Sequence, residues 1–377
     1  MPPSKKILLI SLLKPADEPR MYEHFGKTLL TAGYEVHLAG QNLSCLHSNT
    51  SNPIIFHPIF NFKRLNLKRL FAPVSVLLLT IRLNPEIIII STPELLKIFF
   101  FYKLFRKVKV YYDIQENYFE NIIHATWYPP VLNYILACTL RLNEWIYSKM
   151  FDGFFLAEKS YQHELPFIKN KKWIVLENKM WLENGLKEKI TRQHFPKKKN
   201  YGDSVKFLFT GTLDEDTGIF SAIEITKKIH ALYPQLSLDI VGSVTRESIF
   251  EKLQDQLMNV SYIRFLGSKQ FVQHDKILSA ILNADFGIID YQPFPHIQHK
   301  IPSKLYEYLS CGLPIIINQN PQWELMVSTY QAGFSVPFKT ESVNSIVDML
   351  FKEFYPNGPV KESLWNTEEN KLLNFLG

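Results

Sequence analysis

Short apolar runs and amphipathic segments alternate along the first half of the chain. The run Ile7–Ile10 is continuously apolar, which is typical of a strand buried on both faces of a parallel sheet. Apolar residues at helical spacing predict a helix over 21–32 that ends at Gly33, and Val36–Ala39 follows as a second strand. This strand–loop–helix–strand opening predicts a doubly wound parallel sheet. Further strands are expected at 87–90, 108–112 and 153–157.

The same order begins again after a lysine-rich stretch. Lys206–Thr210 is predicted to be a strand, Gly211–Leu213 a loop and Phe220–Leu232 a helix. Later strands are expected at 236–241, 263–266, 286–289 and 314–317. The sequence therefore predicts an α/β protein with two Rossmann-like, doubly wound parallel-sheet domains facing a cleft. We expect a first domain over 1–175, a basic linker over 176–203 and a second domain over 204–355.

Composition narrows the class of protein. The 377 residues exceed one ordinary domain, and 46% apolar with 21% charged residues is close to globular averages. The three cysteines (Cys45, Cys138 and Cys311) lie too far apart for a zinc site or a disulfide framework, which favours a reducing compartment. The sequence shows neither a signal peptide nor a membrane-spanning run. We expect a cytoplasmic protein, or one that is peripheral at the inner face of a membrane.

Charge is distributed unevenly between the two halves. Residues 1–200 carry 28 Lys+Arg against 16 Asp+Glu, a net charge of +12, and the remaining 14 against 20 give −6. One basic stretch runs from Lys63 to Lys109 and interleaves its cations with aromatic and aliphatic residues. This pattern is compatible with a solvated face, with nucleic acid, and with an anionic membrane surface or acceptor. If the stretch binds a partner, we expect an anionic membrane surface or acceptor and no nucleic acid.

The segment 288–317 contains the most informative motif. A strand ends at Asp290, a loop with several prolines and histidines leads to Pro302, and a short helix follows from Lys304 to Ser310. The start of a helix offers free N–H groups and a positive dipole end to an anion. Lys304 adds a charge there that suits a diphosphate. Glu307 lies one turn deeper, where a carboxylate can accept hydrogen bonds from the hydroxyls of a ribose.

The segment 302–314, P-S-K-L-Y-E-Y-L-S-C-G-L-P, resembles the P-x-K-x-x-E-Y-x-x-x-G-x-P signature of GT-B glycosyltransferases, specifically the retaining family 4-like group. Four other segments in the same order resemble features of that group. They are Asp17–Arg20 with Ala32–Val36 (the D-x-R…x-G-H-x-V opening), Tyr111–Glu116 (the V-Y-D-x-H-E strand end), Phe209–Leu213 (the first strand and glycine loop of the nucleotide domain) and Trp365–Leu376. The last looks like the closing helix, so the resemblance implies that residues 356–377 cross back to the N-terminal domain.

The resemblance implies transfer of a sugar from a nucleotide diphosphate sugar, of the UDP or GDP type, to a glycan or lipid-linked acceptor, with retention of configuration. The donor would bind the second domain and the acceptor the first, without a metal or another cofactor. The implied donor-binding residues are Gly211, Thr212, Asp290, Tyr291, Ser303, Lys304 and Glu307. The implied catalytic residues are His299, Gln115 and Glu116, and Arg20 and Asp113 would lie on the acceptor side. The loop Pro293–His299 would face the sugar.

The sequence departs from the family pattern at four positions. His299 stands where the family has the first of two glutamates, and Gln115 stands where a histidine is common. Thr212 and Thr217 occupy places that often carry cations, and removal of one such donor typically costs about 10²–10³ in rate. Two other functions therefore stay open. One is a non-catalytic GT-B scaffold or regulator, and the other is a nucleotide-sugar epimerase of the same architecture.

Overall fold

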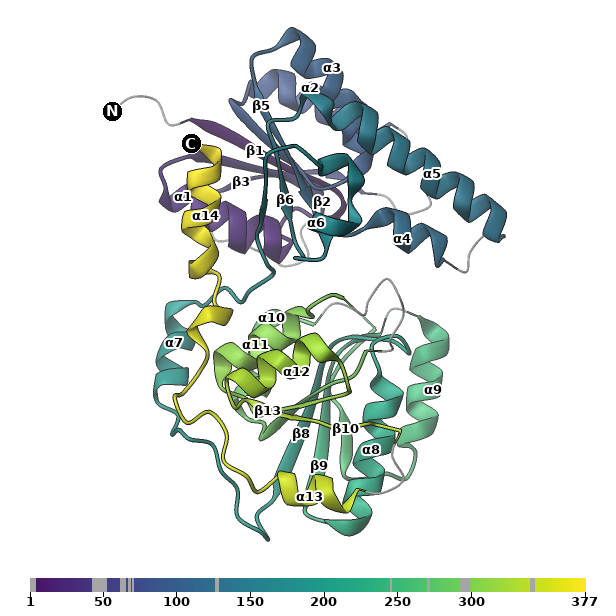
Figure 1. Ribbon diagram of the computed structural model, residues 1–377, viewed down its shortest axis with the longest axis vertical. Coiled ribbons are helices and arrows are strands. Elements are labelled where there is room, and N and C mark those ends of the chain that lie inside the picture. Colours follow the sequence, from purple (N-terminus) through teal and green to yellow (C-terminus); the bar gives the residue numbers. More distant parts are fainter. Residues whose placement is uncertain are drawn as a thin grey trace. The chain divides into compact units, whose positions relative to one another are not determined.

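The computed structural model describes residues 5–42, 53–61, 66, 69, 71–125, 129–244, 246–269, 272–291, 299–339 and 343–377. The chain divides into two compact units (Figure 1). Unit 1 comprises Met1–Trp181 with Trp365–Gly377, and unit 2 comprises Leu182–Leu364. Among the described residues, each unit contains one sheet whose neighbouring strands are all parallel.

The sheet of unit 1 has the strand order β3-β2-β1-β4-β5-β6-β7. Its strands are β1 (Lys6–Pro15), β2 (Glu35–Gln41), β3 (Ile55–Phe60), β4 (Ile87–Ile90), β5 (Lys109–Ile114), β6 (Gly153–Leu156) and β7 (Trp173–Val175). The central strands are apolar on both faces because helices cover both sides, as a parallel sheet requires. The carboxyl ends of β1, β4 and β5 meet at one edge, where the order reverses between β1 and β4.

Two groups of helices cover the faces of this sheet. The π-helix η1 (Arg20–Gly26), α1 (Lys27–Thr31) and the C-terminal helix α14 (Asn366–Leu376) pack on one face. On the other face lie α2 (Ala72–Leu83), α3 (Leu96–Phe105) and α5 (Pro130–Tyr147), which Figure 1 shows side by side. The remaining short helices are η3 (Pro93–Leu95), α4 (Tyr118–Ile123), η4 (Ser148–Met150), α6 (Tyr161–Glu164) and η5 (Pro166–Ile168).

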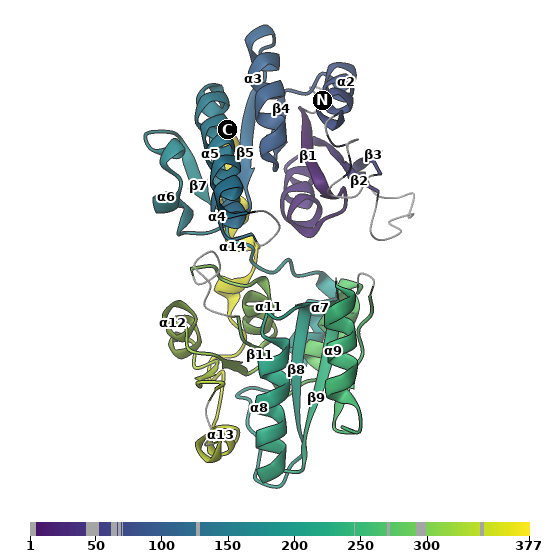
Figure 2. The same ribbon diagram turned by 90° about the vertical axis from the view of Figure 1, so that its right-hand side faces the viewer.

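The sheet of unit 2 has the strand order β10-β9-β8-β11-β12-β13. Its strands are β8 (Val205–Leu213), β9 (Leu236–Val244), β10 (Ile263–Phe265), β11 (Phe286–Ile289), β12 (Ile315–Ile317) and β13 (Gly333–Ser335). Its helices are α7 (Asn184–Thr191), α8 (Ile219–Leu232), α9 (Glu247–Leu257), α10 (His274–Leu282), α11 (Ser303–Cys311), α12 (Pro321–Thr329), α13 (Asn344–Met349) and η6 (Lys361–Ser363). Figures 1 and 2 show α8 and α9 on one face, and α10, α11 and α12 on the other. The strand order reverses between β8 and β11, so ligands are expected at the carboxyl ends of these two strands.

The prediction of two doubly wound parallel α/β domains is confirmed, and several details differ. Gly211–Leu213 extend strand β8 instead of forming a loop, because they pair with β9 as far as Val244. The helix predicted over 21–32 begins as a π-helix. The strands β3, β7 and β13 were not predicted. Residues 182–203, which the sequence assigned to a linker, belong to unit 2 and include α7.

No helix in the described ranges is both long enough and apolar enough to cross a bilayer.

Candidate functional site

The carboxyl end of β8 lies against the start of α11 in unit 2. Gly211 has a φ of +97°, which L side chains rarely adopt. A Cβ on Gly242 of β9 would lie 2.0 Å from the carbonyl oxygen of Gly211, so the two strand ends pack backbone against backbone. The hydroxyls of Thr210 and Tyr308 are 2.8 Å apart and tie β8 to α11. The Cε atom of Lys304 lies 3.8 Å from the place that a Cβ of Gly211 would occupy. The predicted residues Gly211 and Lys304 therefore lie side by side.

Lys304, the second residue of α11, carries a buried amine. Its side chain is 5% exposed, and its Nζ has no hydrogen-bond partner among the described residues. The Nζ atom lies 4.2 Å from the centre of the Phe209 ring and 5.0 Å from that of Tyr291. Burial lowers the pKa of this amine to about 7, against the attraction of Glu307 and Asp290. An unpaired amine at a helix N-terminus is suited to binding an anion.

Glu307 lies one turn beyond Lys304 on the same helix. Its Oε1 is 3.2 Å from Nε2 of His274, the first residue of α10, and the Glu307 side chain is 17% exposed. One carboxylate oxygen is thus held in place by the imidazole. Sequence reasoning missed His274, because 33 residues separate it from Glu307 and no motif connects the two. A histidine at the start of the helix before a buried strand was the only available signal.

Asp290 and Tyr291 follow β11 and complete this end of the sheet. Asp290 is fully buried and accepts a hydrogen bond of 2.7 Å from Asn318 Nδ2. Burial raises the pKa of Asp290, and hydrogen bonds from Ser221 and Asn318 oppose the increase. Gly218, with a φ of +78°, packs so closely that a Cβ would lie 1.9 Å from the Asp290 carbonyl oxygen. Asp290 therefore fixes the loop that precedes α8.

Of the two threonines that replace family cations, Thr212 lies at the end of β8 and Thr217 in the loop between β8 and α8. Thr217 Oγ1 lies 2.9 Å from the carbonyl oxygen of Thr212 and 2.9 Å from that of Asp214, and it accepts a hydrogen bond of 3.0 Å from Asp214 N. Thr212 itself is exposed. The structure thus assigns Thr217 to holding the turn. Arg246, before α9, forms an ion pair with Asp214.

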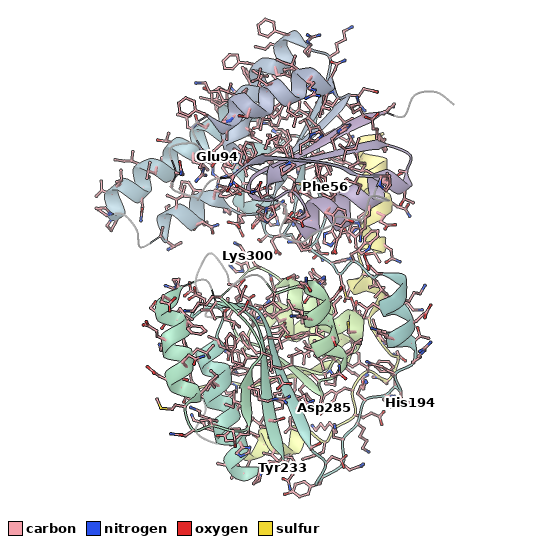
Figure 3. The ribbon with its side chains drawn as sticks, turned by 180° about the vertical axis from the view of Figure 1, so that it is seen from behind. Phe56, Glu94, His194, Tyr233, Asp285 and Lys300 are labelled. Carbon is pink, nitrogen blue, oxygen red and sulfur yellow. The ribbon has the colours of Figure 1, made fainter. Side chains whose placement is uncertain are left out.

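The remaining predicted residues of unit 2 lie near the start of α11. Ser303 is the exposed first residue of that helix, and His299 is exposed where the described chain resumes after Tyr291. Residues 292–298, which include most of the loop expected to face the sugar, lie outside the described residues. Figure 3 shows Lys300 at this end of unit 2 and Tyr233 toward the opposite end.

A second group of predicted residues forms a buried network in unit 1. Arg20 Nε donates to Asp113 Oδ2 at 2.9 Å, and Nη2 donates to Oδ1 at 2.6 Å. Arg20 also donates from Nη1 to the Leu176 carbonyl oxygen at 2.8 Å. Asp113 Oδ2 accepts a further bond of 2.9 Å from Gln115 Nε2. Arg20 is 3% exposed and Asp113 is fully buried. Arg20 and Asp113 thus face each other and orient Gln115, and their role on the acceptor side stays a prediction.

Gln115 and Glu116 line a cavity of about 230 Å³ at the carboxyl ends of β1, β4 and β5. Its lining includes Ser11, Lys14, Ser91, Thr92, Gln115 and Glu116. Lys14 Nζ donates to Glu18 Oε1 at 2.9 Å and to Gln115 Oε1. Burial opposes the charge on Lys14, but Glu18, Glu116 and Asp113 hold its pKa above the ordinary value.

The wall of this cavity includes two buried hydroxyl groups, those of Ser11 and Thr92. Ser11 Oγ and Thr92 Oγ1 are buried and make no hydrogen bond to the part of the chain that the structure describes. Together with the Lys14 amine and the Glu116 carboxylate they can hold a ligand rich in hydroxyl groups. Sequence reasoning missed Ser11 and Lys14, which lie in β1, and Thr92, which follows β4, because none of them belongs to a motif.

Among the described residues, no group of three or more His, Cys, Asp or Glu side chains could hold a metal ion. Each of the two sites contains an amine of the chain, Lys304 in unit 2 and Lys14 in unit 1.

Comparison with known proteins adds one family match. Residues 190–353 match the family model described as glycosyl transferases group 1, which covers most of unit 2, including the ends of β8 and β11 and all of α11. None of the curated proteins matches the chain.

Solved structures of two-domain enzymes superpose on nearly the whole chain. Sucrose-phosphate synthase from Thermosynechococcus elongatus matches with a TM-score of 0.67 and 13% identity, over 99% of this chain and 98% of that one. Anabaena Alr3699/HepE in complex with UDP and glucose matches with a TM-score of 0.64 and 13% identity, over 99% of both chains. An α,α-trehalose-phosphate synthase (UDP-forming) from Burkholderia vietnamiensis matches with a TM-score of 0.64 and 9% identity, over 98% of this chain and 99% of that one. The two-domain fold is the one these GT-B structures share.

Proposed function

We propose that this protein transfers a sugar from a nucleotide diphosphate sugar, of the UDP or GDP type, because residues 190–353 match the family model of glycosyl transferases group 1 and the chain has the GT-B fold. The acceptor is a glycan or a lipid-linked glycan, and the configuration at the transferred carbon is retained. The observation that carries the proposal is the buried amine of Lys304 beside Gly211, which has no hydrogen-bond partner within the described ranges.

In this proposal, the end of β8 and the start of α11 hold the donor. The protonated Lys304 amine and the N–H groups of the first turn of α11 neutralise the diphosphate, and Gly211 lets the phosphates approach the backbone. Glu307, oriented by His274, accepts hydrogen bonds from the ribose hydroxyls. Neutralisation of the diphosphate promotes transfer because it is the leaving group, and its charge develops in the transition state.

The sugar and the acceptor are assigned to the remaining predicted residues. Asp290, Tyr291 and His299 would contact the transferred sugar from unit 2. Gln115 and Glu116 would contribute from the unit 1 cavity, in which the hydroxyls of Ser11 and Thr92 make no hydrogen bond to any described residue. Retention requires the new bond to form on the face from which the diphosphate leaves. Because acidic and amide groups at such positions can accept a proton or hold a hydroxyl, they are suited to this step. Arg20 and Asp113 keep a positioning role, since they hold Gln115.

Calorimetric titration of the full chain with UDP, GDP, CDP and uridine tests the donor site. We expect UDP or GDP to bind. We also expect Glu307→Gln to weaken the matching diphosphate and its nucleoside alike, by about tenfold or more, because a charge-assisted hydrogen bond to the ribose is lost. Glu251→Gln, an exposed position on α9, is the matched control. A wild-type protein that binds none of these nucleotides would overturn the assignment.

Two other functions share the fold and are separated by activity. The uncharged Thr212 and Thr217 favour a non-catalytic GT-B scaffold. Such a protein would bind the nucleotide, but the wild type and the Glu307→Ala variant would consume donor at the same rate. A nucleotide-sugar epimerase would act without an acceptor and would exchange a ring hydrogen of the free sugar with deuterium in heavy water. A transferase consumes donor in an acceptor-dependent way and loses that activity in the Glu307 variant.

A further inference from the structure

The outward faces of three neighbouring helices in unit 1 are apolar. On α2, Leu78 and Ile81 are 64% and 50% exposed, and on α3, Phe105 is 83% exposed. A stripe of residues spaced by three or four runs along the outer side of α5 and includes Ile135 and Trp145. The opposite sides of the same helices carry the residues that pack toward the sheet. A surface helix normally places polar residues outward, so exposed apolar side chains on three neighbouring helices depart from the usual pattern.

The charge on this surface, which we call the α2–α3–α5 face, has one sign. The only acidic residue in the three helices is Glu144, which is 1% exposed and forms an ion pair with Arg141. Exposed cations are present, with Lys97 on the outer side of α3 and Arg106 directly after it. Arg82 near the end of α2 is also exposed. Lys63, Arg64 and Lys68 of the basic stretch lie outside the described residues. The face thus combines apolar side chains with cations and exposes no carboxylate from its helices.

A groove between α2 and α3 extends this face inward. It has a volume of about 560 Å³, and its apolar walls include Leu77, Ile81, Phe101 and Phe105. Lys97 and Arg106 also line it, together with Glu94, which is paired with Arg69. An apolar groove with amines at its border matches a lipid that has an acyl chain and an anionic headgroup.

We propose that the α2–α3–α5 face docks on a lipid leaflet that contains anionic phospholipid. Phe101 and Phe105 enter the acyl region, and Lys97 and Arg106 bind the phosphates. The one-sided charge favours a membrane over a second copy of this chain, because a two-fold interface would bring the face against itself and its cations against one another. This proposal goes beyond the sugar-transfer proposal and does not depend on it, since it uses no residue of the nucleotide site.

Co-sedimentation of the full chain with lipid vesicles tests this surface. One set of vesicles is phosphatidylcholine alone, and the other contains 30 mol% phosphatidylglycerol, about a third of the lipid, which is enough for a strongly negative surface. We expect binding only to the anionic vesicles, with affinity falling as salt is added. Each basic residue near the lipid contributes about fivefold in affinity, so Lys97→Glu with Arg106→Glu should weaken binding by more than tenfold. Lys187→Glu with Lys189→Glu, exposed on α7, changes the net charge equally and should bind better than this double variant.

A second pair of variants tests insertion. Phe101→Ser with Phe105→Ser should also weaken binding more than tenfold, whereas Tyr201→Ser, an exposed aromatic of unit 2, should not. Quenching of tryptophan fluorescence by brominated lipid should decrease in Trp145→Phe. Because these side chains are exposed, the melting temperatures of the variants should stay unchanged. Absence of wild-type binding, or face variants that match their controls, would overturn the proposal. A wild type that is dimeric, with a Phe101→Ser and Phe105→Ser variant that is monomeric, would also overturn the proposal. The face would then be a protein interface.

Discussion

Methionine in place of Lys304 removes the buried amine and keeps a long unbranched side chain, so it separates the effect of charge from that of packing. The amine lies between the rings of Phe209 and Tyr291 and has no hydrogen-bond partner in the described part of the chain. Its charge is therefore costly in the free protein, and burial lowers its pKa from 10.5 to about 7. The same charge becomes favourable when a diphosphate lies beside it.

The sign of the pH dependence follows from this difference. Below pH 7 the amine is protonated in the folded and unfolded states, and the whole cost of the buried charge is present. Between pH 7 and 10.5 the unfolded chain binds more protons, so stability rises with pH by up to about 1.4 kcal/mol per unit. The accumulated cost at pH 7 is about 4 kcal/mol. We therefore expect the Lys304→Met variant to be more stable than the wild type at pH 6, and this advantage to shrink above pH 7.

Urea unfolding of both proteins at pH 6, 7.5 and 9 measures the stability difference. Calorimetry with UDP at pH 8, in buffers of different ionisation enthalpy, measures the proton taken up on binding. An amine with a pKa of about 7 is mostly neutral at pH 8, so a diphosphate that recharges it should take up about 0.9 proton. Lys304→Met should bind UDP more weakly and take up none, and Lys276→Met, exposed on α10, should behave as the wild type. A stability difference independent of pH, with no proton uptake, would refute the reasoning.

Two further substitutions address positions that hold the sites together. Arg20→Met leaves a buried carboxylate without its cation and should lower the free energy of unfolding by about 3–5 kcal/mol in urea, whereas the exposed Arg192→Met should change it little; equal values for the two variants would contradict the positioning role. Gly242→Ala would place a Cβ 2.0 Å from the Gly211 carbonyl oxygen, so it should lower stability by more than about 1 kcal/mol and weaken UDP binding. Gly185→Ala is the control in thermal unfolding and calorimetry, because nothing lies within 4 Å of a Cβ at that position. Matching curves for the two variants would show that the ends of β8 and β9 can separate.

The local pattern determined the central elements of both sheets. β4 coincides with the predicted range 87–90 and β11 with 286–289, because a strand buried on both faces has to be apolar throughout. Gly312 ends α11 as expected, with a φ of +67°. Three of the four edge strands, β3, β7 and β13, were missed because one side of each lacks a neighbour and the selection for apolar residues is weaker. β3, for example, contains Pro58 and has exposed positions.

The face on which an apolar helix residue lies could not be read from the sequence alone. The stripe that includes Ile135 and Trp145 has the spacing of a core-facing helix, yet the structure exposes it. A helical period indicates that two sides differ, but only packing decides which side meets the sheet. Here the side with Ala137 packs inward, because its small residue permits a close approach.

The order of motifs along the chain indicated the kind of site and most of its parts, since Lys304 and Glu307 are neighbours on one helix turn. Partners that are far apart in sequence required the fold. Glu307 meets His274 across 33 residues, and Arg20 meets Asp113 across 93. The sequence placed a cation at the start of α11, but only tertiary packing buried its amine beside the rings of Phe209 and Tyr291. Burial and pairing depend on every element that surrounds a side chain, and no local stretch of sequence contains that information.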